Sequence, residues 1–359
     1  MHLRHSCSHS LKGNKYVILP KNKVFVDKYK NIFDKDVVEK FKQKTGITKM
    51  YRTTKDQTSS DLGFVASRYL IEKLRINRNE IGVLIFVSQS PDYRKPATAC
   101  VLQNRLGLKM DCAVFDVNLG CSGFVYGDQI IRSFMSSCDT KYGLLIVAET
   151  SSKQASDNDK TIGMMFGDAG SAVLYNKGTS EENITLLKSD GSRYRSIIVP
   201  SGGFRDMTPE KSTFVDFEGF ERSKFDSYMD GMAVFAFSIT DVPTMLKEYL
   251  SYINKSGNDF DFLLLHQANQ MMIKQIAKRL KVSLDKVPLS LDRYGNTSGV
   301  SIPLTICDAF GKTEGKKLKI LASGFGIGLS LGVTSFEVDT NNILPIIETD
   351  ECYDEGKFL

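Results

Sequence analysis

The stretch DVNLGCSGF, residues 116–124, sets a pattern that the rest of the chain repeats. It follows the apolar run Ala113-Val114-Phe115, typical of a buried strand, and leads into a segment whose apolar residues recur with helical spacing. Cys121 is therefore predicted among the first residues of a helix. Free backbone N–H groups and the helix dipole favour a thiolate there, and Gly120 and Gly123 let a substrate approach closely. We interpret Cys121 as a nucleophile and not as a buried structural cysteine.

Composition excludes several classes of protein. The chain has 359 residues, 42% hydrophobic and 25% charged, which is typical of a globular protein of about two domains. Its net charge of +5 comes from scattered lysines, which argues against a nucleic-acid binder. No apolar run approaches the roughly 20 residues of a membrane span, and residues 1–15 lack the apolar centre of a secretory signal. Seven cysteines without a spacing pattern favour the cytoplasm over a disulfide framework.

The histidines are distributed unevenly. His2, His5 and His9 lie beside Cys7 in residues 1–15, which we interpret as a disordered leader and not as a metal site. The remainder of the chain contains a single histidine, His266. If imidazole takes part in the chemistry, His266 is the candidate; no metal and no resident cofactor are expected.

Strand and helix patterns occur twice along the chain. The buried run Val83–Val87 ends in Ser-Gln-Ser, and the buried run Asp261–Leu265 ends in His-Gln-Ala-Asn. Leu289–Leu291, the turn YGNTSG (294–299) and a helix opened by Pro303 match the strand, turn and helix around Cys121. This repetition predicts an α/β protein of two related halves, residues 16–180 and 181–339. Residues 340–359 are acidic and aperiodic, and are predicted to be a surface-wrapping or disordered tail.

Cys121, His266 and Asn296 form a coherent chemical set, because each follows an apolar strand pattern in one of the two halves. A cysteine thiolate attacks a carbonyl carbon. A histidine donates a hydrogen bond to an oxyanion or exchanges a proton, and an asparagine polarises the same oxygen without changing charge. Alone, Gly295-Asn296 is a common turn dipeptide; the matched positions favour an active site at the seam between the halves.

Three segments carry a family resemblance: NLGCSGF (118–124), HQAN (266–269) and YGNTSG (294–299). They resemble those of β-ketoacyl-acyl-carrier-protein synthase III, in the thiolase superfamily. The weaker segments TGI (45–47), PATAC (96–100) and FGD (166–168) occur in the family's order. The resemblance covers roughly residues 30–338.

The resemblance implies a five-layered αβαβα thiolase fold and a homodimer. Cys121 would accept an acyl group from an acyl-coenzyme A or acyl-carrier-protein thioester. His266 and Asn296 would then bind malonyl-acyl-carrier protein and stabilise the enolate formed as carbon dioxide leaves. The resemblance also implies an oxyanion hole from the backbone of Cys121, Gly326 and Ile327, and pantetheine contacts at Phe166, Ala268 and Asn269.

The chain departs from the bacterial fatty-acid members of the family at the substrate entrance. Lys40 and Lys44 stand where those members have a tryptophan and an arginine that grip coenzyme A, and Met271 replaces an arginine that meets the carrier protein. Met271, Lys274 and Lys278 share one helical face by spacing, which predicts a carrier-protein face displaced by one turn. Ile327 also stands in place of a glycine between Gly326 and Gly328.

Three alternatives remain. The same fold could transfer the acyl group to an amine or hydroxyl without decarboxylation, although the sequence shows no second general base. A papain-like protease also uses Cys, His and Asn in this order, but Cys121 lacks the Cys-Trp context and the duplicated pattern does not fit. A non-catalytic partner subunit of a synthase usually loses the cysteine, which is retained here.

Overall fold

A computed structural model describes residues 15–177, 184–215 and 221–354. The leader cluster of His2, His5, His9 and Cys7 lies outside these ranges. Within them, no helix combines the length and hydrophobicity needed to cross a membrane.

The first half of the chain, together with one strand from the C-terminal segment, builds a six-stranded mixed sheet. Its strand order is β16 (Ile347–Thr349), β1 (Lys15–Pro20), β7 (Ala169–Asn176), β6 (Tyr142–Glu149), β4 (Ile81–Val87) and β5 (Ala113–Val117). Strand β4 is parallel to β5 and β6, whereas β7 is antiparallel to β6 and β1. Because β4, β5 and β6 run in the same direction, the residues that follow them meet at one edge of the sheet.

The second half builds a four-stranded sheet in the order β13 (Phe262–Leu265), β14 (Lys317–Gly326), β15 (Ser330–Asp339) and β8 (Thr185–Ser189). Strand β13 is parallel to β14, as β4 is to β6, and β14 and β15 pair antiparallel over ten residues, as β6 and β7 do over eight. The repeated strand order shows the internal duplication. No strand forms at 289–291, where the repeat predicted one; Leu291–Tyr294 is instead the single-turn helix α7.

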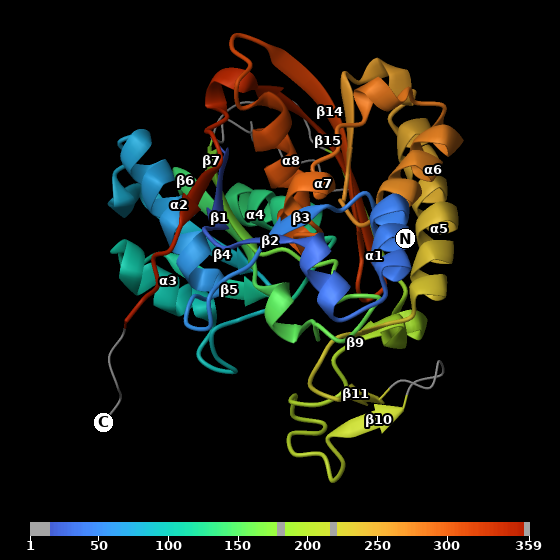
Figure 1. Ribbon diagram of the computed structural model, residues 1–359. Helices are drawn as coiled ribbons and strands as arrows, with labels where there is room; N and C mark the ends of the chain where they lie inside the picture. Colours follow the sequence, from blue (N-terminus) through green and yellow to red (C-terminus); the bar gives the residue numbers. More distant parts are fainter. Residues whose placement is uncertain (1–14, 178–183, 216–220, 355–359) are drawn as a thin grey trace.

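Five layers result from these two sheets (Figure 1). Helices α2 (Ser59–Lys73) and α3 (Thr98–Leu106) cover the outer face of the first sheet, and α5 (Gly231–Tyr252) and α6 (Gln270–Leu280) cover the outer face of the second. Helices α4 (Gly123–Ser137) and α8 (Ser301–Phe310) pack between the two inner faces. The architecture is the predicted αβαβα thiolase fold.

Side-chain alternation explains why separate cores form on the two faces of the first sheet. Along β4, Val83, Ile85 and Val87 point to the central layer, whereas Leu84 and Phe86 contact α2 and α3. A continuous apolar run therefore serves a strand with helices on both faces.

Helix boundaries follow local signals. Helix α1 (Lys35–Thr45) ends at Gly46, which adopts a left-handed φ of 83°, as is common for a glycine at a helix C-terminus. Helix α2 begins at Ser59, and its N-cap is Thr58, which forms a capping box with Asp61. Helix α5 continues through Pro243.

The crossover between the halves carries small antiparallel elements outside the two main sheets. Strand β9 (Ile197–Ile198) pairs with β12 (Tyr228–Met229), and β10 (Thr213–Val215) pairs with β11 (Glu221–Ser223). Near the N-terminus, β2 (Lys23–Phe25) pairs antiparallel with β3 (Lys49–Tyr51), with α1 between them in the chain.

The C-terminal segment is more ordered than its sequence indicated. After β15, the chain returns to the first sheet, where β16 pairs parallel with β1. The backbone N–H of Tyr353 then donates to the carboxylate of Asp61, 3.0 Å away, and the guanidinium of Arg105 stacks over the Tyr353 ring. The segment predicted as a surface-wrapping or disordered tail thus supplies an edge strand and is anchored on α2.

Candidate active site

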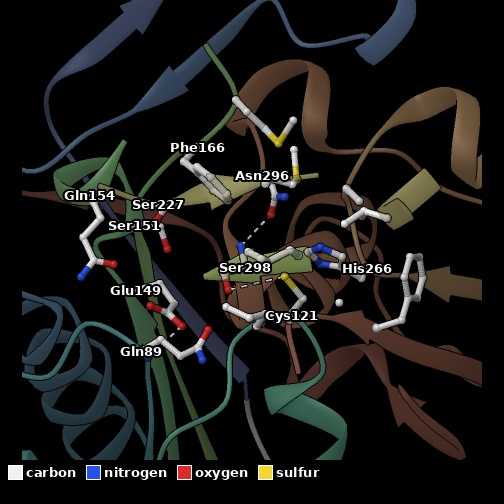
Figure 2. A pocket seen from close by; sticks show the side chains of 18 of the residues that line it. Gln89, Cys121, Glu149, Ser151, Gln154, Phe166, Ser227, His266, Asn296 and Ser298 are labelled. Carbon is white, nitrogen blue, oxygen red and sulfur yellow. Dashed lines mark hydrogen bonds between the residues drawn. The ribbon is translucent and has the colours of Figure 1, made fainter. Parts of the chain in front are cut away.

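A cavity of ≈ 380 Å³ lies between the two halves and brings Cys121, His266 and Asn296 together (Figure 2). Its apolar wall comes mainly from the loop before β7, from β9 and β12, and from α5 and α6. Its polar wall follows the ends of β4, β5 and β6. The polar lining includes Gln89, Asn118, Glu149, Ser151, Gln154, Ser227 and Ser298.

Cys121 lies in the turn between β5 and α4, two residues before the helix begins. Two glycines of β14 let the second sheet approach it closely. A methyl group on Gly326 would lie 2.6 Å from Cys121 Cβ and 2.9 Å from Sγ, and one on Gly324 would lie 3.0 Å from the Cys121 carbonyl oxygen. Ser122 also contacts Ser330, with their hydroxyl oxygens 2.7 Å apart. The nucleophile is therefore held against the strand end that carries Gly326 and Ile327.

The environment of Cys121 does not produce the resting thiolate that the helix start predicted. Burial raises the pKa of its thiol to about 11, and the charge of Glu149 acts in the same direction. Hydrogen bonding from Ser298 and from the backbone of Ile327 and Cys121 lowers the pKa only in part. Desolvation thus outweighs the helix terminus, and the resting group is a thiol whose proton must leave during attack.

His266 directly follows β13 and is almost fully buried. Its Nδ1 lies 2.8 Å from the hydroxyl oxygen of Ser301, the first residue of α8, and the ring meets Phe325 edge-on. Burial lowers the pKa of His266 to about 3. The imidazole is therefore neutral at physiological pH, and Nε2 is the nitrogen left for a ligand in the cavity.

Asn296 is oriented by its own turn. Gly295 has a φ of 71°, and the Asn296 backbone N–H donates to the carbonyl of Met165 at 2.9 Å. The side-chain Oδ1 accepts from the backbone N–H of Ser298 at 2.9 Å. Because the oxygen is engaged, the amide NH₂ group is the part that can donate to a substrate oxygen.

The FGD segment positions the site. Phe166 lines the cavity, as expected. Gly167 packs against the Tyr294 carbonyl, which a methyl group would approach to 2.1 Å. The buried Asp168 carboxylate accepts from the backbone and hydroxyl groups of both Thr53 and Ser152, at 2.6 to 3.0 Å. Asp168 therefore joins the loop after β3 to the loop after β6.

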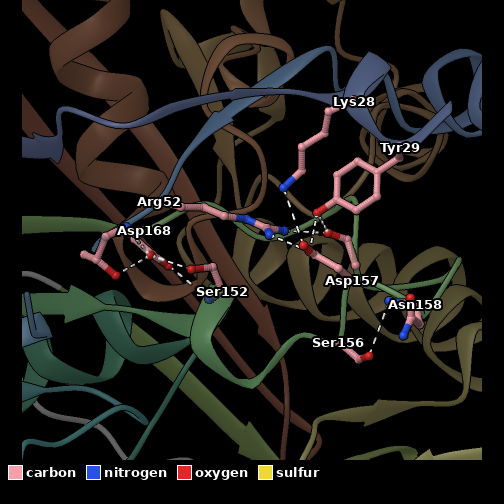
Figure 3. Close-up of polar contacts among 10 residues, drawn as sticks. Lys28, Tyr29, Arg52, Ser152, Ser156, Asp157, Asn158 and Asp168 are labelled. Atoms are coloured by element: carbon pink, nitrogen blue, oxygen red, sulfur yellow. Dashed lines mark hydrogen bonds and ion pairs between the residues drawn. The ribbon is translucent and has the colours of Figure 1, made fainter. Parts of the chain in front are cut away.

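Arg52, in the loop directly after β3, anchors the same wall (Figure 3). Its guanidinium donates to Asp157 Oδ1 at 2.8 Å and to the carbonyl of Gly163 at 2.5 Å. The Tyr29 hydroxyl donates to Asp157 at 2.6 Å. Although burial opposes the effect, these hydrogen bonds hold the pKa of Asp157 below its usual range. The cluster ties the cavity-forming loop to the N-terminal segment.

The remaining predicted positions fall into two groups. Ala268 and Asn269 line the cavity, and Asn269 also caps α6 by accepting from the Met271 N–H at 2.8 Å. Met271, Lys274 and Lys278 lie on the exposed face of α6, which packs against α1, where Lys40 and Lys44 are exposed. The structure thus places this cationic face beside the pocket-lining residues at the start of α6.

Sequence reasoning assigned no role to four polar residues that define the site: Gln89, Glu149, Ser298 and Ser301. The available signal was that Gln89 and Glu149 terminate or follow buried parallel strands, whose carboxyl ends commonly bind ligands. Glu149 is a second general base in the cavity. The absence of such a base therefore no longer argues against acyl transfer to an amine or hydroxyl.

The arrangement suits carbonyl chemistry. A cysteine nucleophile shares a largely enclosed space with two neutral donors, His266 and Asn296. Neutral donors stabilise a developing oxyanion without acting as bases. The described residues contain no cluster of acidic, histidine or cysteine side chains suited to a metal ion.

Comparison with known proteins decides the family. Models of the 3-oxoacyl-[acyl-carrier-protein (ACP)] synthase III family match residues 115–192, and of its C-terminal region residues 250–338. β-Ketoacyl-[acyl-carrier-protein] synthase III of Clostridium perfringens is 33% identical over 314 residues, covering 84% of this chain and 94% of the relative. The chain belongs to the 3-oxoacyl-[acyl-carrier-protein] synthase III family.

Other members of the synthase III family agree in sequence and structure. The Xanthomonas campestris enzyme is 33% identical over 298 residues, covering 82% of this chain and 88% of the relative. The crystal structure of 3-oxoacyl-(acyl-carrier protein) synthase from Burkholderia xenovorans LB400 is 31% identical, with a TM-score of 0.89 over 97% of this chain and 99% of that one. Membership of this family excludes the papain-like protease.

Proposed function

We propose that the protein catalyses acyl transfer from a thioester to Cys121, followed by decarboxylative condensation with malonyl-acyl-carrier protein. The product is a β-ketoacyl thioester. The observation that carries the proposal is the convergence of Cys121 with the neutral donors of His266 and Asn296 in one cavity.

In the first step, Cys121 Sγ bonds to the acyl carbon, and the bond from that carbon to the donor's sulfur breaks. The tetrahedral oxyanion requires donors that are already oriented. The backbone groups of Cys121 and Ile327 that hydrogen-bond toward Sγ support this role. The donor departs as a thiol, and the acyl group remains on Cys121.

In the second step, His266 Nε2–H and the Asn296 amide donate to the thioester oxygen of the malonyl group. The bond to the carboxylate carbon breaks and carbon dioxide leaves. The electron pair of that bond stays on the remaining carbon and forms an enolate. The enolate carbon attacks the acyl-cysteine, and the Cys121 thiolate leaves. This sequence needs no base to remove a carbon-bound proton and no resident cofactor.

Exposed lysines near the cavity support a proposal for the acyl donor and for the protein partner. Lys40, Lys44, Lys274 and Lys278 are exposed on two adjacent helices, α1 and α6. Such a cationic face suits an acidic carrier protein or the phosphates of a coenzyme A donor. The six cysteines of the described ranges are all free, which suits a reducing compartment such as the cytoplasm.

A homodimer is proposed through β5. This strand pairs only with β4 in the six-stranded sheet, and all five of its residues are half-buried. Phe115 contacts the half-buried Phe134 of α4, with the two rings tilted at 48°, leaving an apolar edge beside the segment that carries Cys121. Unpaired strand edges pair readily with a second copy, and sedimentation equilibrium would test this assembly.

Plain acyl transfer to an amine or hydroxyl is the second candidate. Glu149 favours it, because a buried carboxyl group in the cavity could accept the acceptor's proton. The His266–Asn296 donor pair favours condensation instead.

Intact-mass measurement with acyl-coenzyme A and acyl-carrier-protein donors, followed by malonyl-carrier protein and carbon dioxide detection, separates the candidates. We expect a mass gain that Cys121→Ala abolishes. His266→Ala and Asn296→Ala should still be acylated but release carbon dioxide at least roughly a hundredfold more slowly. The exposed Asn158→Ala serves as the control. Acylation without carbon dioxide release, but with transfer to an amine or hydroxyl, would favour the alternative; absence of acylation from every donor would refute both.

A further inference from the structure

Glu149 is a buried acid that the condensation mechanism does not use. It ends β6, is only 1% exposed, and lines the same cavity as Cys121. Its carboxyl oxygens accept from the Gln89 backbone N–H at 3.1 Å and from the Ser90 hydroxyl at 3.0 Å. No lysine or arginine in the described part of the chain pairs with it. Burying a carboxylate without a neighbouring cation is costly, and acids in such environments cluster at functional sites.

Ser298 lies between this acid and the nucleophile. Its hydroxyl oxygen is 3.9 Å from Cys121 Sγ, and Ser298, Glu149 and Cys121 line the same cavity. The Ser298 side chain also lowers the pKa of Glu149. Ser298 has a left-handed φ of 51°, which non-glycine residues seldom adopt. Figure 2 shows Ser298 beside Cys121, with Glu149 on the same side of the pocket.

We propose that Ser298 and Glu149 form a proton relay that activates Cys121. As Sγ attacks the acyl carbon, the thiol proton passes to Ser298 Oγ, and the Ser298 hydroxyl proton passes to the Glu149 carboxylate. When the bond to the donor's sulfur breaks, the proton returns along the same path and leaves on the departing thiol. Glu149 is thus a positioning and proton-storing residue that acts through Ser298. The relay rests on the proposed acyl transfer.

The protonation state of Glu149 suits this task. Burial raises its pKa to about 8, and the nearby Asp168 carboxylate raises it further, while Gln89, Ser90 and Ser298 lower it by hydrogen bonding. The titratable groups that face it are thus Asp168, held by Thr53 and Ser152, and Cys121 itself. A base with this pKa is matched to proton transfer near neutral pH. Such a base explains how the Cys121 thiol, with a pKa near 11, can lose its proton during attack.

The test is the pH profile of Cys121 alkylation by iodoacetamide, followed by intact mass from pH 6 to 10. In the unmodified protein we expect the rate to rise through about pH 8, as Glu149 ionises and accepts the thiol proton. Glu149→Gln preserves the shape of the side chain and removes the base. It should abolish this inflection and slow alkylation at pH 8.5 by about tenfold or more. Ser298→Ala should do the same, and the double variant should be no slower than either.

The opposite result refutes the relay. If Glu149 is only a repelling charge, its neutralisation lowers the Cys121 pKa, and Glu149→Gln is alkylated faster above about pH 8, where Glu149 is ionised. An unchanged profile in Ser298→Ala would also refute it. Asp92→Asn is the matched control, because Asp92 is another buried carboxyl group whose pKa burial raises, yet it does not line the cavity. Its profile should match that of the unmodified protein.

Failure of the relay and failure of the proposed function are distinguishable, because iodoacetamide needs no acyl donor. Loss of the pH 8 inflection in Glu149→Gln, in a protein that accepts no thioester, would support the relay's proton path and refute the synthase. Normal acylation with faster alkylation in the variant would refute the relay alone.

Discussion

Nδ1 of His266 lies 2.8 Å from Ser301 Oγ, which joins the residue after β13 to the first turn of the central helix α8. The contact sets the ring's orientation and leaves Nε2 for the substrate. Ser301, in the buried middle layer, therefore orients His266, which lines the cavity.

Ser301→Ala is expected to separate the two half-reactions. Without the hydroxyl, Nδ1 loses its partner in a buried environment, which costs about 1–3 kcal/mol. Carbon dioxide release should fall roughly ten- to hundredfold, while acylation of Cys121 stays unchanged. Ser301→Thr keeps a hydroxyl and should retain more activity. An equal loss in both half-reactions would show instead that Ser301 supports the fold as a whole.

Gly326→Ala is expected to displace Cys121. The added methyl group would lie 2.6 Å from Cys121 Cβ and 2.9 Å from Sγ, so backbone must move. Overpacking of this kind typically costs about 1–3 kcal/mol, and acylation measured by intact mass should drop severely. Gly191→Ala is the control, since a methyl group there meets nothing within 4 Å. A normal acylation rate in Gly326→Ala would contradict the close contact.

Glu149 should make the fold less stable at alkaline pH. Its folded pKa of about 8 exceeds the usual value of 4.5, so the folded state keeps a proton that the unfolded state releases. The stability from this group is present below pH 4.5 and is lost as pH rises through 8. From pH 6.5 to 8.5, the free energy of unfolding should fall by about 2 kcal/mol. In urea unfolding, the free energy of unfolding of Glu149→Gln should fall less over this pH range. The same fall in both proteins would contradict the raised pKa of Glu149.

Arg105→Ala should weaken the C-terminal anchor. Arg105 Nη2 lies 2.9 Å from Asp61 Oδ1, both side chains are almost fully buried, and Arg105 stacks over Tyr353. Removing the cation leaves Asp61 buried and unpaired, which costs about 3–5 kcal/mol. Thermal unfolding should shift down, and limited proteolysis should cut the C-terminal segment sooner. Lys141→Ala, which breaks an exposed pair with Glu80, should cost less than about 1 kcal/mol. Equal losses of stability in Arg105→Ala and Lys141→Ala would contradict a role for Arg105 in anchoring the C-terminal segment.

Much of the architecture was predictable because its signals are local. The apolar run at β4, the glycine stop after α1 and the turn before α4 depend on neighbouring residues, and their repetition indicated the two halves. Leu289–Leu291 misled because the repeat is imperfect: the second half has no counterpart of β5. The edge strand within the predicted surface-wrapping or disordered tail was not foreseen, because β16 forms only by pairing with β1, more than 320 positions away in the chain.

By itself, the sequence determined the α/β class, the family and the residues Cys121, His266 and Asn296, since strand periodicity and short motifs are written in adjacent positions. Only the tertiary structure decided the protonation states. Cys121 is a thiol and His266 is neutral because segments from both halves exclude water from them. The placement of Ser298 between Cys121 and Glu149 likewise arises from three distant turns meeting at one cavity. Desolvation and convergence depend on what packs nearby in space, which no local pattern records.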